Sequence, residues 1–164
     1  MSALVSVVMG SRSDWQTMKY VNDTLASMSI SHEARIVSAR RTSDKVAKYV
    51  SLAEEQGVKV IVASASGTGQ LPAILASRTH IPVLAVPLES KSVNGKDSLL
   101  SMAQMPAGVP IGTFAIGRAG AINAALMAAS MLANDHDVIR KALVNYRAQQ
   151  ITPALHSMNS SIAV

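Results

Sequence analysis

Short apolar runs alternate with amphipathic segments from one end of the chain to the other, and this alternation limits the folds open to the sequence. The runs have the length and apolar content of buried parallel strands. We expect five strands, over residues 4–9, 34–38, 58–63, 82–86 and 111–116. Segments with the apolar spacing of helices lie between and after them, over residues 15–28, 44–56 with Gly57 as the stop, 71–78, 97–104, 119–133 and 137–149.

Strands that alternate with helices at this spacing form a parallel sheet with right-handed helical crossovers on both faces. The predicted fold class is therefore α/β: a three-layer, flavodoxin-like (Rossmann-like) domain with five core strands. No linker or low-complexity tract interrupts the sequence, so we expect a single domain over residues 1–150. Residues 151–164 are polar and lack a pattern, and we expect them to form a C-terminal tail that is frayed or lies on a neighbouring subunit.

The chain carries few charges for a protein in water. Charged residues make up 15% of it and hydrophobic residues 49%, whereas an average domain is about 25% charged. Aromatic residues are only 3%, so the core must be built from Ala, Val, Ile, Leu and Met. So little charge leaves apolar surface to cover, which predicts large interfaces between subunits.

Several classes of protein and site are excluded by the sequence. It has no cysteine for a disulfide scaffold or a thiolate metal site, and its four histidines lie too far apart for metal-ligand spacing. The longest uncharged stretch, residues 98–117, is broken by Pro and Gly and does not predict a membrane span. No basic segment precedes an apolar run at the start, so we expect no secretory signal and a cytoplasmic protein.

The net charge of +5 permits binding to nucleic acid, but the distribution of charge argues against it. The basic residues are scattered, with doublets only at Arg40-Arg41 and Arg140-Lys141, and few aromatic side chains are present to stack on bases. A small anionic ligand is the better prediction.

Ligands of such sheets bind at the carboxyl ends of the strands, where the loops of this chain are rich in Gly, Ser and Thr. The loop Gly10-Ser-Arg-Ser-Asp14 combines a tight strand exit, two hydroxyls and a helix start, which favours a phosphate. Its polar residues are equally typical of a plain helix cap. Arg40 and Arg41 could pair with a phosphate or form a solvated rim, and residues 64–72 could hold a carboxylate or planar ring or form only a turn.

The order of these motifs resembles that of a known family. The motifs are Gly10-Ser-Arg-Ser-Asp-Trp15, Ser38-Ala-Arg-Arg-Thr-Ser-Asp44, a small-residue loop ending in Leu71-Pro72, and Met105-Pro-Ala-Gly-Val-Pro-Ile-Gly-Thr113 with Ala115-Ile-Gly117. Together they resemble the class I N5-carboxyaminoimidazole ribonucleotide mutases of purine biosynthesis, the PurE family, over residues 4–150. The resemblance implies a three-layer α/β subunit in a homo-octamer, with no metal or organic cofactor. It also implies an enzyme that moves a carboxylate from the exocyclic nitrogen of an aminoimidazole ribonucleotide to a ring carbon.

The resemblance also implies roles for individual residues. Ser11, Ser13 and Arg41 correspond to phosphate ligands, and Asp14 corresponds to the acceptor of a ribose hydroxyl. The backbone of residues 65–69 resembles the cradle of the base and of the migrating carboxylate. The full expected substrate-binding set is Gly10, Ser11, Ser13, Asp14, Ser38, Ala39, Arg41, Ser64, Ala65, Ser66, Gly67, Thr68, Gly69 and Leu71. The Ala-rich helix 119–133 resembles the central packing helix of the octamer, although an Ala-rich core helix of a monomer would read the same.

The chain departs from the family at its two active-site histidines. Arg40 stands where the second motif of the family has His, and Gln70 stands where the third motif has His. Ser64 and Ser66 stand where the third motif has Gly. A proton shuttle needs a pKa near the operating pH, which Arg and Gln do not offer. We expect none of the remaining histidines to replace them: His32 and His80 lie at the wrong ends of strands, His136 between the last two helices and His156 in the tail.

Three interpretations follow. The one favoured by the two replacements is a paralogue that binds an aminoimidazole ribonucleotide, or a close analogue, and catalyses carboxylation or decarboxylation with an altered mechanism in which Arg40 and Gln70 occupy the catalytic positions. The second is a working mutase in which water or substrate carries the proton. The third is an oligomer that binds a nucleotide without catalysis.

Overall fold

The computed structural model describes residues 2–38, 43–89 and 95–159, with the side chains of 43–44 and 151–159 left out. Its centre is a five-stranded parallel sheet in the order β2-β1-β3-β4-β5. The strands are β1 (Val5–Met9), β2 (His32–Ile36), β3 (Val60–Ala65), β4 (Val83–Pro87) and β5 (Gly112–Thr113). This is the order of a flavodoxin-like fold, as the sequence predicts.

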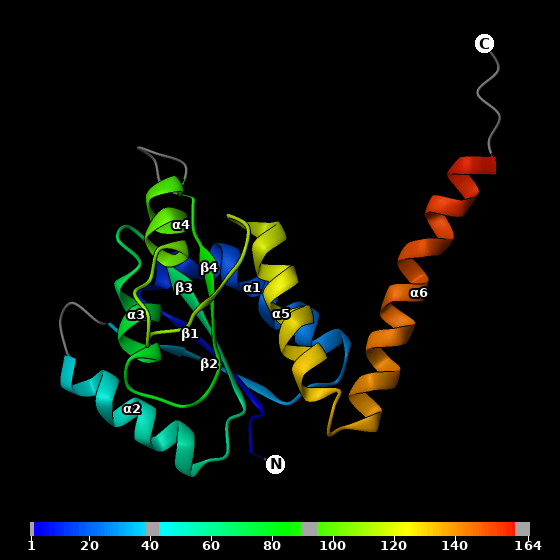
Figure 1. Cartoon of the computed structure of the whole chain (residues 1–164). Helices are drawn as coiled ribbons and strands as arrows, with labels where there is room; N and C mark the ends of the chain where they lie inside the picture. Colours follow the sequence, from blue (N-terminus) through cyan, green and yellow to red (C-terminus); the bar gives the residue numbers. More distant parts are fainter. Residues whose placement is uncertain (1, 39–42, 90–94, 160–164) are drawn as a thin grey trace.

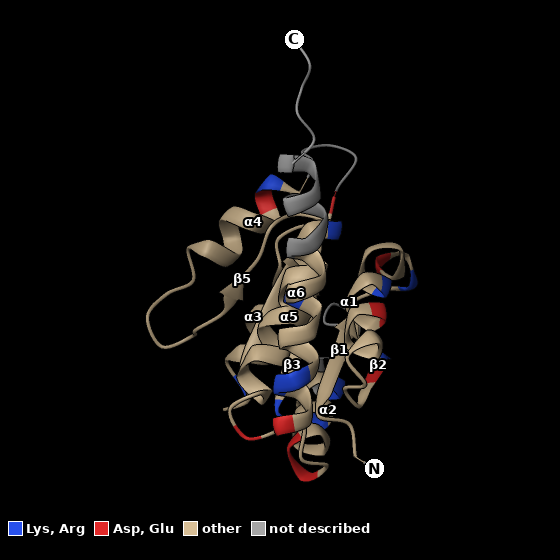
Figure 2. Ribbon diagram, turned by 90° about the vertical axis from the view of Figure 1, so that its right-hand side faces the viewer, with Lys and Arg blue, Asp and Glu red and all other residues tan. Residues whose placement is uncertain are grey.

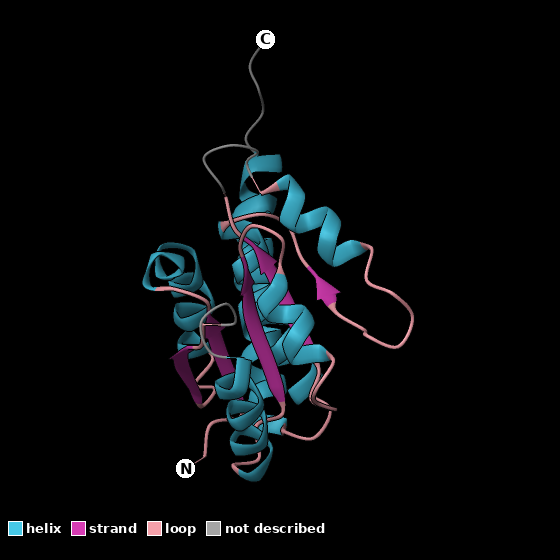
Figure 3. Ribbon diagram, turned by 90° about the vertical axis from the view of Figure 1, so that its left-hand side faces the viewer, coloured by secondary structure: helices cyan, strands magenta, loops and turns pink. Residues whose placement is uncertain are grey.

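Helices cover both faces of the sheet (Figures 1 and 3). A 3₁₀ turn, η1 (Arg12–Asp14), leads from β1 into the first helix. The α-helices are α1 (Trp15–Ser27), α2 (Ser43–Glu55), α3 (Gln70–Ala76), α4 (Lys96–Ala103), α5 (Arg118–Leu132) and α6 (Asp137–Asn159). The predicted three-layer α/β architecture is therefore confirmed, with element boundaries that shift by a few residues.

Alternate residues of the strands build two separate cores. Val7 of β1 faces the α1 and α5 side, whereas its neighbour Val8 faces the α2 and α3 side, and both are fully buried. Side chains of successive strand residues point to opposite faces, so a strand covered on both faces is largely apolar. That requirement explains the mainly apolar sequences of β1, β3 and β4, in which the buried serines Ser6 and Ser64 have hydrogen-bond partners.

The alanines of α5 are buried inside the subunit itself. Six of the seven alanines within residues 119–133 belong to the core shared with α1 and the sheet: Ala121, Ala124, Ala125, Ala128, Ala129 and Ala133. Gly120 fits the same packing, since an added Cβ would collide with the carbonyl of Ala115. The small residues thus serve close packing of α5 within one chain.

Two elements differ from their predicted extents. The predicted strand 111–116 forms only two ladder pairs in β5, at the outer edge of the sheet beside α4 (Figure 2). Beyond β5, Phe114 N donates to Ala85 O and Gly117 N to Pro87 O, at 3.1 and 2.9 Å. Between these two hydrogen bonds the chain advances three residues after β5 but only two residues along β4, so the regular ladder is interrupted.

The last helix is longer than predicted. We expected α6 to end near residue 149, but it continues to Asn159 and occupies much of the expected tail. No glycine follows Gly120, so the sequence offers no glycine stop signal there. Ile139 and Leu143 of α6 are buried against the core, and the helix then projects from the body of the subunit (Figure 1). None of the described helices combines the length and the apolar content needed to cross a bilayer.

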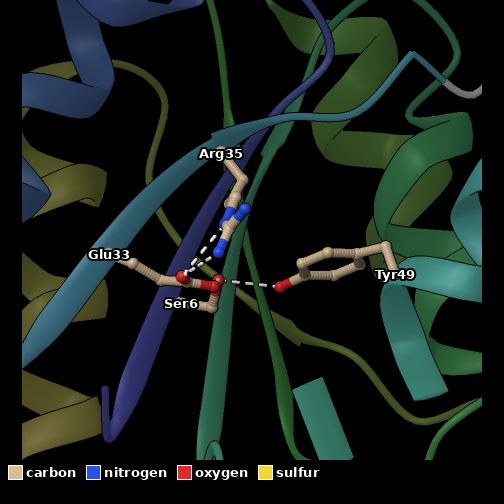
Figure 4. Close-up of polar contacts among 4 residues, drawn as sticks. All are labelled: Ser6, Glu33, Arg35 and Tyr49. Carbon is tan, nitrogen blue, oxygen red and sulfur yellow. Dashed lines mark hydrogen bonds and ion pairs between the residues drawn. The ribbon is translucent and has the colours of Figure 1, made fainter. Parts of the chain in front are cut away.

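A polar network ties α2 to the first two strands (Figure 4). The hydroxyl of Tyr49 donates to Ser6 Oγ at 2.7 Å, and Ser6 Oγ donates to Glu33 Oε1 at 3.1 Å. Arg35 donates from Nε and Nη2 to the other oxygen of Glu33, at 3.0 and 2.8 Å. Burial raises the pKa of Tyr49 to about 12. The network holds α2, the helix that follows the second predicted loop, against the sheet.

A second contact fixes the loop after β3. Ser98 of α4 is buried and donates its hydroxyl to Gly67 O at 2.7 Å. Gly69 has a φ of +66°, and a Cβ added to it would collide with the methyl group of the buried Met102, also on α4. The backbone angle favours glycine, and any side chain at this position would require Met102 to move. Helix α4 therefore holds residues 66–69 in place.

Removing the phenol of Tyr49 tests the first contact. Tyr49→Phe should lower the free energy of unfolding by about 1 kcal/mol near pH 8. The folded pKa of about 12 lies above the ordinary 10, so this stabilisation is complete below pH 10 and is lost as the pH rises toward 12. Urea unfolding from pH 8 to 11.5 should show the wild type losing stability more steeply above pH 10 than the variant. Parallel curves would contradict the assignment.

Two glycine substitutions test the second contact. Gly57 has a φ of +79° with open space around its Cβ position, whereas Gly69 has both a positive φ and the Met102 collision. Each change to Ala carries the strain of a left-handed residue, about 1 kcal/mol. Gly69→Ala should cost about 1 kcal/mol more than Gly57→Ala because buried Met102 must shift. Thermal unfolding of both variants measures the difference, and equal losses would show that Met102 does not confine the loop.

Candidate functional site

The crevice of the sheet lies between β1 and β3. These neighbouring strands continue into helices on opposite faces, β1 into α1 and β3 into α3. Such a switch point leaves a gap above the carboxyl ends of the two strands, where ligands of open α/β sheets bind. The loops of residues 10–14 and 66–69 border this gap.

A hydrogen-bonded cluster around Asp14 joins the two strand ends. Asp14 is 5% exposed, and its Oδ2 accepts from Gly10 N at 3.0 Å, from Ser11 N at 3.3 Å and from Ser64 Oγ at 2.7 Å. Its Oδ1 accepts from Ser11 Oγ at 2.8 Å. Gly10 N also donates to Ser64 Oγ at 3.2 Å. The carboxylate is thus held by residues from both strands.

Two serines, Ser11 and Ser13, extend this hydrogen-bonded cluster to the surface. Ser11 Oγ lies 2.6 Å from Ser13 Oγ, and Ser13 is exposed. Because the one hydroxyl proton of Ser11 points to Asp14, Ser13 must donate to Ser11. Serine hydroxyls at a strand end can donate to an anion, and a carboxylate beside them can accept from a ligand hydroxyl. The arrangement suits a phosphate ester that also carries hydroxyl groups.

The predicted third loop divides into a buried and an exposed part. Ser64 and Ala65 extend β3 and are buried, so they are not loop residues as the sequence suggests. Residues 66–68 are exposed and follow the carboxyl end of β3. Gln70 is the exposed first residue of α3, and Leu71 is buried, with Cδ2 3.9 Å from the Cβ position of Gly10. The structure therefore brings the first and third predicted loops together.

The second predicted loop is described only at its start. Val37 N donates to Met9 O at 2.7 Å, which places the half-buried Ser38 near the end of β1. Ala39, Arg40 and Arg41 lie outside the described residues.

Histidines lie away from the crevice wherever the structure describes their side chains. At the start of β2, His32 has Nδ1 2.7 Å from Ile30 O and Nε2 2.9 Å from Asn22 Oδ1. His80 precedes β4, with Nδ1 3.3 Å from Glu54 Oε1. His136 lines a cavity at the amino end of β3. In the described part of the chain, no cluster of His, Cys, Asp or Glu side chains could hold a metal ion.

Two residues that fix the site are missed by the sequence analysis. Ser98 and Met102 lie in a helix that follows β4, about 30 positions from the loop they hold. Neither stands in a Gly-rich or charged motif, so no sequence signal distinguishes them from ordinary helix residues. Cavities also lie elsewhere in the described part of the chain: one of about 620 Å³ beside β4, β5 and α5, and one of about 280 Å³ between β2 and α2.

The chain is similar to proteins of known family over almost its whole length. The family model described as AIR carboxylase matches residues 4–152. N5-carboxyaminoimidazole ribonucleotide mutase of Pseudomonas aeruginosa is 50% identical, covering 94% of this chain and 95% of that protein. The mutase of Bacillus subtilis is 50% identical, with 86% and 88% covered, and that of Escherichia coli K12 is 44% identical, with 94% and 92% covered.

The fold agrees with a solved structure. The crystal structure of Treponema denticola PurE superposes with a TM-score of 0.87 at 23% identity and covers 99% of both chains. At that identity the superposition bears on the fold alone. The family match and the high identity to full-length relatives go further, and the chain belongs to the AIR carboxylase (PurE) family.

Proposed function

We propose that this chain is an N5-carboxyaminoimidazole ribonucleotide mutase, an isomerase of purine biosynthesis. The observation that carries the proposal is the 50% identity to the Pseudomonas aeruginosa mutase along nearly the full length of both chains. This support favours the working mutase over the altered carboxylation or decarboxylation chemistry that the sequence alone suggests. The substrate is a small ribonucleotide, and the reaction moves its carboxylate from the exocyclic nitrogen to a ring carbon.

The cluster at the crevice supports a role for each polar group. Ser11 and Ser13 donate to the phosphate together with Arg41, and Asp14 accepts from a ribose hydroxyl. The exposed backbone of residues 66–68 receives the base and the migrating carboxylate. A carboxylate and hydroxyls so close together match the phosphate and sugar of a nucleotide better than they match either part alone.

The proton of the ring carbon needs a carrier other than the two family histidines. Arg40 stays protonated and Gln70 does not titrate, so neither can take up the proton and return it. In this proposal the bond from the exocyclic nitrogen to the carboxylate carbon breaks and the bond from the ring carbon to that carbon forms. Water or the substrate's own carboxylate takes the proton from the ring carbon and returns a proton to the exocyclic nitrogen. Arg40 contributes a permanent positive charge near the carboxylate in transit.

The altered reaction remains the second candidate because of the same two residues. A permanent cation and an amide in place of two histidines suit carboxylation or decarboxylation of a related ribonucleotide. A nucleotide-binding oligomer without catalysis is the third candidate, and turnover distinguishes it from the other two.

The proposal includes a homo-octamer, located in the cytoplasm. Met127 and Met131 of α5 are exposed and line the largest of the cavities named above. Val138 and Val144 of α6 are exposed as well, at 74% and 60%. Exposed apolar side chains on two adjacent helices, in a chain with only 15% charged residues, favour contact with other copies.

Loss of one cation tests the binding mode. Arg41→Ala should abolish detectable binding of an aminoimidazole ribonucleotide in calorimetric titration, because the phosphate loses a bidentate, charged partner. Arg78→Ala, an exposed arginine that follows α3, is the matched control and should bind like the wild type. Unchanged binding by Arg41→Ala would contradict the site assignment.

Restoring the histidines tests the reaction. The wild type should convert N5-carboxyaminoimidazole ribonucleotide slowly, and Arg40→His with Gln70→His should raise kcat by about 100-fold because a general acid–base returns. Only the double variant should show a rate dependence centred near pH 6.5. Mass spectrometry of the products distinguishes the candidates. A decarboxylated or newly carboxylated product would support the second candidate. Binding of the ribonucleotide with no product would support the third.

A further inference from the structure

Ser64 holds a position that differs from the role expected for it. The expected role is contact with substrate, but its side chain is buried, with the residue 2% exposed. Its one hydroxyl proton goes to Asp14 Oδ2 at 2.7 Å, and its oxygen accepts from Gly10 N at 3.2 Å. A hydroxyl that donates its only proton inside the protein has none left for a ligand. Ser64 therefore acts on the site through Asp14.

The two oxygens of Asp14 are not equivalent. Oδ2 accepts from three donors, namely Gly10 N, Ser11 N and Ser64 Oγ, which fills its acceptor capacity. Oδ1 accepts only from Ser11 Oγ among the described residues. The next hydroxyl to reach this carboxylate, from a ligand, must bind at Oδ1.

The hydroxyls of the cluster are also ordered. Ser13 donates to Ser11, and Ser11 donates to Asp14 Oδ1. If both serines donate to a phosphate, the Ser11 hydroxyl must turn away from Asp14. Oδ1 then loses the hydrogen bond from Ser11 and can accept another. Binding of the phosphate then prepares the acceptor for the sugar hydroxyl, provided that Asp14 stays in place without Ser11 Oγ.

We infer that Ser64 is a positioning residue. Its hydrogen bond to Oδ2 holds Asp14 in place when the Ser11 hydroxyl turns from Asp14 to the phosphate. Oδ1 is then free to accept from a hydroxyl of the ligand. This inference rests on the proposed nucleotide site. It concerns a residue that stands where the family motif has glycine. The device is thus particular to chains with a hydroxyl at this position.

The inference predicts a selective loss of affinity for sugar phosphates. Two probes separate the parts of the site: methyl phosphate offers only the phosphate ester, and ribose 5-phosphate adds the hydroxyls. Ser64→Ala should weaken ribose 5-phosphate about tenfold, the size of one hydrogen bond to a charged group, and should leave methyl phosphate unchanged. Trp15, the single tryptophan, directly follows Asp14 and provides a fluorescence signal for both titrations.

Three further variants isolate the pathway through Asp14. In an Asp14→Asn background, Ser64→Ala should cause no additional loss, because its effect passes through the carboxylate. Ser64→Cys keeps the packing but donates weakly, so it should lose sugar affinity without a change in folding. Ser6→Ala is the matched control. It removes a fully buried strand hydroxyl that bonds to Glu33 and Tyr49 and not to Asp14, so it should keep wild-type affinity for both probes.

The outcomes distinguish the inference from the proposed function. If the wild type prefers ribose 5-phosphate and both Ser64 variants keep that preference, the inference is wrong while the nucleotide site stands. Equal losses for both probes, or additive losses in the Asp14→Asn background, would also overturn it. If the wild type binds neither probe, the proposed site itself is wrong and the inference falls with it.

Discussion

The parallel pairing of β1 with β3 is the constraint on which the site depends. These strands lie side by side but send the chain to opposite faces, so their carboxyl ends cannot be covered by either helix layer. Asp14 and Ser64 come from the two sides of this gap and meet in a buried hydrogen bond of 2.7 Å. A buried carboxylate is costly unless its oxygens are satisfied, and the two backbone amides and the hydroxyl around Oδ2 satisfy it. The same bonds leave Oδ1 with Ser11 Oγ as its partner among the described residues.

Much of the fold could be predicted from the sequence because its central strands are buried on both faces. Such strands are mainly apolar on both faces, so β1, β3 and β4 stand out as short apolar runs, interrupted only by Ser6 and Ser64. The glycines and serines that follow them mark the edge at which ligands bind. Edge elements carry less information: β5 needs only two ladder pairs, and α6 continues past its apolar pattern to Asn159. Their extents depend on contacts that the local sequence does not encode.

The sequence predicts that the candidate site residues lie together, but it does not predict which contacts each of them makes. Sequence patterns place Ser11, Asp14 and Ser64 near one ligand, and the structure brings all three together. Sequence patterns do not show that the Ser64 hydroxyl donates its proton to Asp14, because this depends on the direction in which a buried side chain points. Ser98 was missed for a related reason: its bond to Gly67 O joins segments 31 positions apart. Long-range hydrogen bonds of this kind decide which residues touch a ligand and which hold those that do.

A crystal structure of the chain with an aminoimidazole ribonucleotide bound would test the account most directly. The account predicts the phosphate on Ser11 and Ser13, a ribose hydroxyl on Asp14 Oδ1, and Ser64 still bonded to Oδ2. The base should lie along residues 66–68. A nucleotide seated instead in the cavity beside β5 and α5, or a direct bond from Ser64 to the ligand, would contradict it.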